Sequence, residues 1–127
     1  MDLFLTSQWP LGIDEALSMS KALPDMKQIF HNSSSSLAAV IDLVKPRYIY
    51  SSQLDIYHKR QPFLLSNGVP CRFIALASLP GKHKPADSKE VYIQAIELEP
   101  LSKVSKIEDV IGVTDDCEKS SPYSIIL

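Results

Sequence analysis

The chain is short of several residue types, and each shortage excludes a class of protein. Its two cysteines, Cys71 and Cys117, fit no Cys-x-x-Cys or Cys/His spacing, which argues against a zinc site and against a disulfide-stapled secreted scaffold. Its four glycines form no glycine-rich phosphate loop. No apolar run approaches the roughly 20 residues that cross a bilayer. We therefore expect no cofactor and no membrane partner.

The net charge is small as well. Lysine and arginine number 13 against 15 aspartates and glutamates, so the formal charge is -2 and any basic patch must be local. Apolar residues make up 45% and charged residues 22% of the chain, as in ordinary soluble globular proteins. The 127 residues fit one domain. We expect that domain over residues 1–100 and a linker or extension over 101–127, where the sequence becomes charged and serine-rich.

The first half of the chain predicts a strand, a helix and a second strand. Residues 3–5 form a short apolar run closed by Trp9-Pro10, which predicts a buried strand ending in a loop. The apolar spacing of residues 37–44 predicts a buried helix, capped by one of the serines at 33–36. This helix should end before the next proline, because proline disfavours helical geometry in the residue before it. A strand over 48–50 should follow.

The second half has an antiparallel pattern. Residues 63–65 and 69–78 are typical of two strands about the turn Ser66-Asn67-Gly68, whose Asn-Gly pair tolerates a positive φ. Residues 91–98 alternate well enough to predict another strand. A parallel start and an antiparallel finish predict an α/β fold with a mixed sheet and a flanking helix. Residues 11–32 stay open, being either helical around 14–22 or a loop.

Two segments carry a resemblance to a known family. Leu5-Thr6-Ser7-Gln8-Trp9-Pro10 and the segment 46–55 resemble the last two metal-binding blocks of the calcineurin-like metallophosphoesterases, and most closely those of the RNA lariat debranching enzyme. In that enzyme the blocks contain Leu-Ser-His-Asp-Trp-Pro and Ser-Ala-His-Leu-His. The three histidine positions fall here on Ser7, Gln53 and Asp55.

The chain also resembles the CwfJ family of spliceosome-associated proteins, through residues 2–10, 45–48, 57–63 and 71–77. This resemblance covers roughly positions 1 to 100 and implies the C-terminal half of a two-sheet metallophosphoesterase-like sandwich. It implies a non-catalytic interaction module that assists intron lariat debranching and turnover. The implied partners are the debranching enzyme, late or intron-lariat spliceosome components and intron RNA, and the implied location is the nucleus.

The residues at the former metal positions predict that the chain is not an enzyme. A two-metal phosphoesterase needs imidazole or carboxylate ligands fixed in number and direction. Ser7 and Gln53 are poor ligands, and Asp55 alone does not make such a site. We therefore predict no catalytic residue and no metal. Residual metal-dependent phosphodiesterase activity, with ligands from a separate first half, is kept as an alternative.

A second alternative is RNA binding by a basic and aromatic rim. Arginine and lysine contact phosphates, and tyrosine offers a stacking face to an unpaired base. The candidate side chains crowd into residues 45–60, with the tryptophan of the first block beside them: Trp9, Lys45, Arg47, Tyr48, Tyr50, Tyr57, His58, Lys59 and Arg60. The same residues also permit a plainer interpretation, in which the tyrosines are strand residues, Trp9 is a packing anchor and the charges form an ordinary solvated face.

The remaining reactive side chains predict no chemistry. His31, His58 and His83 lie in polar or lysine-flanked sequence, which is typical of solvated surface residues. Cys71 begins an apolar run and is expected to be a small buried hydrophobe.

Overall fold

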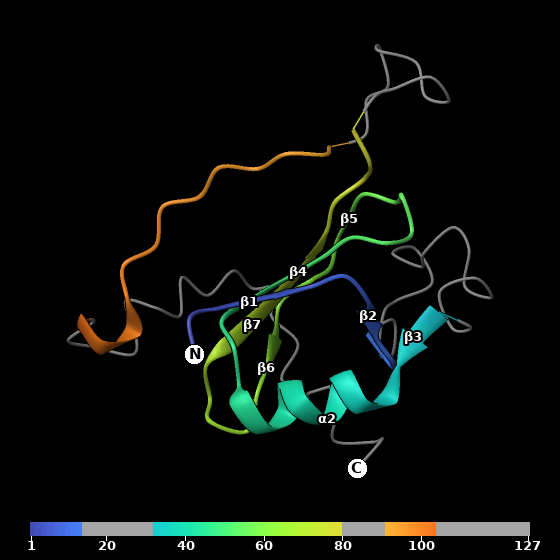
Figure 1. The fold of residues 1–127 in the computed structure, drawn as a ribbon. Coiled ribbons are helices and arrows are strands. Elements are labelled where there is room, and N and C mark those ends of the chain that lie inside the picture. The colour runs from blue at the N-terminus through green and yellow to red at the C-terminus, as the bar shows by residue number, and fades with distance from the viewer. Residues whose placement is uncertain (14–31, 80–90, 104–127) are drawn as a thin grey trace.

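The computed structural model describes residues 1–13, 32–79 and 91–103, and its centre is a mixed five-stranded sheet (Figure 1). The sheet order is β1-β4-β7-β5, with β6 also paired to β7. Strands β1, β4 and β7 are mutually parallel, whereas β5 and β6 run antiparallel to β7. This confirms the predicted α/β class and mixed sheet. The strand bounds are Leu3–Thr6 for β1, Tyr48–Ser51 for β4, His58–Lys59 for β5, Phe63–Leu64 for β6 and Pro70–Ala75 for β7.

A second, two-stranded sheet leads into the flanking helix. Strand β2 (Trp9–Pro10) pairs in parallel with β3 (Ser33–Ser34), and helix α2 (Ser35–Val44) follows directly. The Ser34 hydroxyl accepts a hydrogen bond from the Leu37 backbone N–H at 3.1 Å, so the predicted serine cap is confirmed. Lys45 ends the helix in the left-handed region at φ 50, and its N–H donates to the Ile41 carbonyl.

The registers divide the side chains of the sheet between two faces. Phe4, Ile49 and Phe73 occupy one aligned row and belong to the face that we call the inner face, because it packs toward α2. The neighbouring rows point the opposite way and form what we call the outer face. These rows are Leu3, Tyr48 and Arg72, then Leu5, Tyr50, Ile74 and Lys59.

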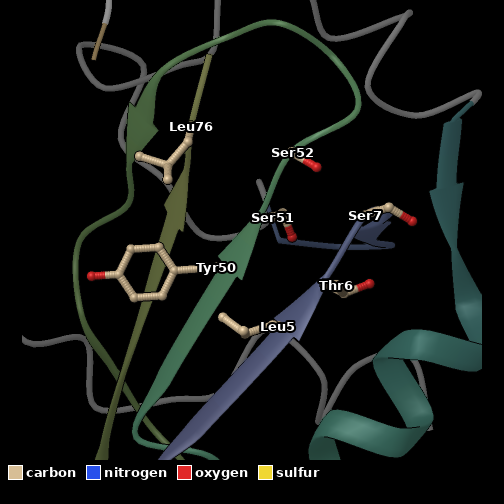
Figure 2. Close-up of a pocket in the computed structure, with 7 residues that line it drawn as sticks. All are labelled: Leu5, Thr6, Ser7, Tyr50, Ser51, Ser52 and Leu76. Carbon is tan, nitrogen blue, oxygen red and sulfur yellow. The ribbon is translucent and has the colours of Figure 1, made fainter. Parts of the chain in front are cut away.

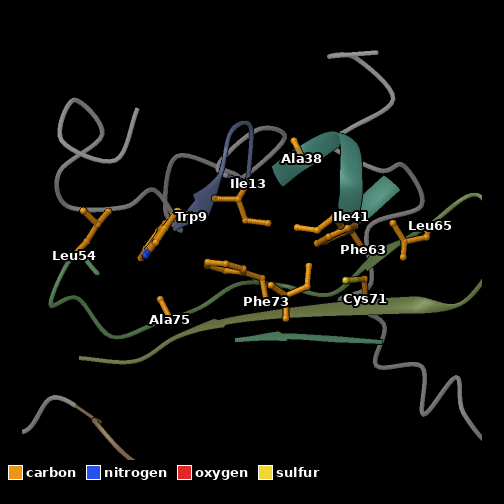
Figure 3. Close-up of a cluster of buried hydrophobic side chains, with 11 residues drawn as sticks. Trp9, Ile13, Ala38, Ile41, Leu54, Phe63, Leu65, Cys71, Phe73 and Ala75 are labelled. Carbon is orange, nitrogen blue, oxygen red and sulfur yellow. The ribbon is translucent and has the colours of Figure 1, made fainter. Parts of the chain in front are cut away.

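The core lies between the inner face and α2 (Figure 3). Ala38 and Ile41 are the buried residues of the helix. Cys71 is fully buried at the start of β7, as the sequence predicts. Burial raises the pKa of the Cys71 thiol to about 12, so this cysteine is protonated and packs as a hydrophobe. The buried cluster is Trp9, Ile13, Ala38, Ile41, Ile49, Leu54, Phe63, Leu65, Cys71, Phe73 and Ala75.

The predicted turn between β6 and β7 is present. Gly68 has φ 76, and its N–H donates to the Leu65 carbonyl at 2.9 Å. The flanking strands are shorter than predicted, since only Phe63–Leu64 and Pro70–Ala75 form ladder pairs.

The predicted strand over 91–98 is wrong. The segment crosses the outer face instead of lying at a sheet edge. Among the described residues, one backbone hydrogen bond joins it to the sheet region, from the Ala77 N–H to the Val91 carbonyl at 3.0 Å. Alternation predicts extended backbone, but a strand also needs a partner edge. Figure 1 shows α2 on one side of the sheet and residues 91–103 on the other.

Several expectations lie outside the described residues or are untested by them. The possible helix over 14–22, His31, His83 and Cys117 fall outside the described ranges. A short 3-10 helix, η2 (Leu101–Lys103), begins the predicted extension, and the Leu101 N–H donates to the Asp2 carboxylate at 3.0 Å. The boundary at residue 100 stays a prediction. No helix within the described ranges is long and apolar enough to span a membrane.

Candidate functional site

The carboxyl ends of β1 and β4 enclose a hollow of about 420 Å³ (Figure 2). The two strands are parallel neighbours, so the residues that follow them meet at one edge of the sheet, where ligands of open α/β sheets bind. The lining is uncharged and combines four hydroxyl side chains with apolar and aromatic ones: Leu5, Thr6, Ser7, Tyr50, Ser51, Ser52 and Leu76.

Of the three residues aligned with phosphoesterase histidines by the sequence resemblance, Ser7, Gln53 and Asp55, the structure brings only Ser7 to this hollow. Gln53 and Asp55 lie in the loop after β4, both exposed and both with positive φ, at 65 and 52. Leu54 between them is buried in the core, which turns its two neighbours outward. The Asp55 carboxylate accepts a hydrogen bond from the Ser78 N–H at 2.7 Å. Across the described ranges, no three His, Cys, Asp or Glu side chains are grouped to hold a metal ion.

Trp9 is fully buried and acts as a packing anchor. Its indole N–H donates to the Ser52 carbonyl at 3.0 Å, which ties the loop after β4 to the core. Its ring meets Phe73 edge-on at 5.1 Å between centroids and stacks on His58 at 6.3 Å. The expectation that Trp9 lines a binding rim therefore gives way to the plainer interpretation.

The two arginines expected on the rim are also interior residues. Arg47 is 8% exposed, and its guanidinium donates to the Asp2 carboxylate at 2.9 Å and to the Glu99 carbonyl at 2.8 Å. The hydrogen bond between Arg47 and the Asp2 carboxylate is the largest of the effects that lower the pKa of Asp2. Because its donors satisfy protein oxygens, Arg47 does not present a free cation to a ligand.

Arg60 is only 2% exposed. Its guanidinium donates to the carbonyls of Ile13 and Gln61 and lies 4.7 Å from the centroid of the Phe63 ring. Burial of a charge is tolerated here because its donors bond backbone oxygens and its flat face covers an aromatic ring. Arg60 therefore differs from its expected place on an exposed rim.

Lys45 and His58 also differ from the expected rim. The Lys45 ammonium donates to the Asp42 carbonyl at 2.7 Å, at the end of α2. His58 belongs to the inner face, where its Nε2 atom is buried without a hydrogen-bond partner. Burial, followed by the nearby Arg60 charge, lowers the pKa of His58 to about 4, so the imidazole is neutral near pH 7. A solvated surface histidine would not show this shift.

The outer face gathers the cations and rings that remain accessible. The Arg72 guanidinium lies 5.5 Å from the centroid of the Tyr48 ring on the neighbouring strand. Lys59 is exposed and registers with Ile74, which in turn registers with Tyr50. The pKa of Tyr50 is raised, first by burial and then by the nearby hydroxyl groups of Tyr48 and Tyr57.

Sequence reasoning missed Arg72 as a functional candidate. The sequence pattern that could have identified it is a single cation between the apolar residues Cys71 and Phe73. Such alternation is typical of a strand with one solvent-facing side. Among the predicted residues, the structure assembles Tyr48, Tyr50 and Lys59 with Arg72 and leaves Trp9, Arg47 and Arg60 in the interior.

Comparison with known proteins finds no matching family model. The chain is 29% identical over 109 residues to zinc finger CCCH domain-containing protein 59 of Oryza sativa subsp. japonica. It is 31% identical over 112 residues to zinc finger CCCH domain-containing protein 64 of Arabidopsis thaliana. Each match covers 85% of this chain but 17% of the relative, so the chain spans about a sixth of the length of these curated relatives.

These relatives correct the expectation of a CwfJ-type protein. Both are named for a CCCH zinc finger, and nothing in them points to CwfJ or to the debranching enzyme. The interpretation as a pseudo-phosphoesterase module of the spliceosome is therefore wrong. The debranching-enzyme partner and the nuclear location were implied by that resemblance alone, and they stay untested predictions.

The zinc finger in the relatives' names does not fit the residues of this chain. A CCCH site takes three cysteines and one histidine, whereas the chain has two cysteines in all. One of them, Cys71, is fully buried with a raised pKa, and zinc binds the thiolate form. The residues of this chain therefore do not supply the ligands of a CCCH finger.

Proposed function

We propose that the outer face of the sheet binds single-stranded RNA without cleaving it. The observation that carries the proposal is the grouping of Tyr48 and Tyr50 with Arg72 and Lys59 on one face of three adjacent strands. Aromatic rings on a sheet surface stack unpaired bases, and lysine or arginine beside them contacts the phosphates. Arg47 and Arg60 are buried and hydrogen-bonded, and Lys45 lies at the end of α2 with its ammonium bonded to the Asp42 carbonyl, so Arg72 and Lys59 carry the electrostatic part.

The arrangement of the face suits a flexible strand of RNA. Neighbouring strands lie about 4.8 Å apart, so a base over a β4 tyrosine has the β7 and β5 cations on one side of it. Leu3 and Leu5 on β1 are 41% and 70% exposed on the other side, where they offer apolar contact to a base or ribose. Stacking is tolerant of sequence, because every base has a flat apolar face.

The hollow at the strand ends extends this surface. Leu5, Tyr50 and Leu76 line both this hollow and a smaller one of about 250 Å³ over the outer face. Its uncharged hydroxyl lining suits a neutral base better than a phosphate group, because a buried anion needs a compensating cation. We assign the base contacts to the hollow and the phosphate contacts to Arg72 and Lys59.

The relatives support the proposal because both are named as zinc finger proteins. Small zinc-bound modules are recurring nucleic-acid-binding units. Since this chain lacks the ligands of a CCCH finger, we propose that its sheet supplies a second contact surface in proteins of this kind. Two linked surfaces bind one RNA more tightly than either does alone.

The proposal is tested by titrating the chain into a short fluorescein-labelled oligouridylate and following anisotropy. Replacing Tyr50 by alanine removes the stacking face, and we expect affinity to fall about tenfold to a hundredfold. Tyr50→Phe keeps the ring and loses only the hydroxyl bond to Gln94, and it should bind at least as tightly as the wild type. Equal affinities for Tyr50→Ala and the wild type would refute the proposal.

The phosphate contacts are tested by salt dependence. Each lost phosphate contact lowers the slope of log affinity against log salt by about 0.7 for a single strand, so Lys59→Ala and Arg72→Ala should each show that reduction. Lys45→Asn is the matched control, because it removes a cation at the end of α2 and asparagine tolerates the left-handed backbone there. If Lys45→Asn reduced the slope as much as Lys59→Ala or Arg72→Ala, the phosphate contacts would not be confined to the outer face.

The absence of cleavage is a separate part of the proposal. The bound oligonucleotide and a 2′,5′-branched RNA should stay intact on a denaturing gel when manganese is added in excess. Appearance of products that track the purified chain would show catalysis instead. The finer fold assignment, a calcineurin-like two-sheet sandwich, also stays a prediction that an experimental structure of the chain would test.

A further inference from the structure

Residues 91–99, which we call the strap, cross the face to which we assign RNA binding. Hydrogen bonds hold the strap at both ends. The Val91 carbonyl accepts from the Ala77 N–H at 3.0 Å, and the Glu99 carbonyl accepts from Arg47 at 2.8 Å. Just beyond it, the Leu101 N–H donates to Asp2. The strap is therefore fixed at its ends and spans the sheet between them.

The middle of the strap is held much less firmly. One side-chain bond reaches the sheet there, from the Tyr50 hydroxyl to the side-chain Oε1 atom of Gln94 at 3.2 Å. Below it lies the hollow of about 250 Å³, lined by Leu3, Leu5, Tyr50, Leu76, Gln94 and Ile96. This hollow is open to solvent, so the strap does not pack closely on the sheet there. Ile93 is 73% exposed and Ile96 41% exposed, which shows that the apolar side chains of the strap are not buried against the sheet.

The strap competes with RNA for the same groups. Gln94 and Ile96 line the same hollow as Tyr50, so a base stacked on Tyr50 has to share that space with them, and the bonded hydroxyl ties the ring to the strap. The charge of the strap opposes RNA as well. Its nine residues include Glu97 and Glu99 and no lysine or arginine, so they place negative charge over the face that carries Arg72 and Lys59.

We infer that the strap is a displaceable cover that lowers the RNA affinity of the outer face, and that it lifts in the middle when RNA binds. This inference rests on the proposed RNA binding. Where a binding-competent state is only partly populated, the apparent dissociation constant rises in inverse proportion to that population. Weakening the strap therefore tightens RNA binding without adding a contact.

Two variants test the inference in the same anisotropy assay. Gln94→Ala removes the bond to Tyr50 and should tighten binding roughly twofold to tenfold, which is the worth of one typical hydrogen bond. Replacing residues 92–98 by a glycine-serine linker of equal length removes the cover and should tighten binding further. Ala95→Ser changes the middle of the strap without touching that bond, and serves as the control. Circular dichroism and a thermal melt confirm that each variant folds.

Limited proteolysis gives a readout that does not depend on affinity. RNA should speed cleavage after Glu97 by a glutamate-specific protease, because a lifted strap enters a protease active site more readily. If the wild type binds RNA and the linker variant binds it equally or more weakly, the inference is overturned while RNA binding stands. If neither the wild type nor the linker variant binds RNA, the proposed function itself fails. Slower cleavage after Glu97 in the complex would also overturn the inference, because it would make the strap part of the binding surface.

Discussion

The two faces of the sheet use the same strands for different purposes. The inner face carries Phe4, Ile49 and Phe73 and is sealed by α2, whereas the outer face carries tyrosines and cations under a loosely held strap. Neighbouring residues on one strand therefore belong to different environments. Lys59 is exposed on the outer face, and Arg60, the next residue, is buried among backbone carbonyls. The role of these basic residues therefore depends on which face of the sheet their side chains occupy, and the presence of a charge in the sequence does not show which face that is.

The largest expected change in stability comes from replacing Trp9, and it tests whether this residue belongs to the inner face. Trp9→Ala removes a fully buried ring and the donor to the Ser52 carbonyl, and should lower the free energy of unfolding by about 3–5 kcal/mol. Urea denaturation followed by circular dichroism measures this change. Trp9→Phe keeps the ring contacts with Phe73 and should cost clearly less. A loss below about 1 kcal/mol for the alanine variant would mean that Trp9 is not a packing anchor.

The next effect compares two adjacent cations. Arg60→Met removes the guanidinium donors to the Ile13 and Gln61 carbonyls, and should cost about 3 kcal/mol of stability. Lys59→Met is the matched change on the outer face and should stay within about 0.5 kcal/mol of the wild type. Unfolding by urea measures both. Similar losses for the two variants would remove the distinction between the faces at β5.

Much of this fold follows from local sequence. The serine cap of α2, the Asn-Gly turn before β7 and the α/β class are each properties of a few neighbouring residues, and the structure confirms all of them. The strand expected at 91–98 depends on a partner edge elsewhere in the chain. Alternation within the segment carries no information about that edge, so its extended backbone could be predicted but its pairing could not.

The site was less predictable than the fold for a related reason. Grouping Arg47, Lys59 and Arg60 by closeness in sequence ignored that successive strand residues point to opposite faces. Only the pairing of β5 with β7 shows which of them stays accessible, and the same pairing brings in Arg72 from outside the cluster. The family resemblance failed because it followed short motifs, whereas the curated relatives match 85% of the chain.

A smaller effect comes from His58 on the inner face. The folded state holds the pKa of His58 at about 4, below its ordinary value of 6.5, so the unfolded chain binds the proton more tightly. Stability should therefore fall as pH drops from about 6.5 toward 4, by about 1–2 kcal/mol after allowance for solvent screening of this partly exposed ring. His58→Gln should flatten that part of the profile in urea titrations at stepped pH. The same slope in both proteins would assign the effect to other groups.

The smallest expected change is the coupling energy between Arg72 and Tyr48, which tests whether the outer face contributes to stability. Arg72 and Tyr48 form a cation–π pair at 5.5 Å, which at an accessible site is worth about 0.5–1 kcal/mol. A double-mutant cycle with Arg72→Met and Tyr48→Leu should return a coupling of that size, since both replacements keep the apolar parts of the side chains in contact. A coupling above about 2 kcal/mol would make this pair a structural element like Arg60 and Phe63, and would leave Arg72 less free to hold a phosphate. A small coupling together with the reduced salt dependence expected for Arg72→Ala would separate the groups that hold the sheet together from those that present a ligand surface.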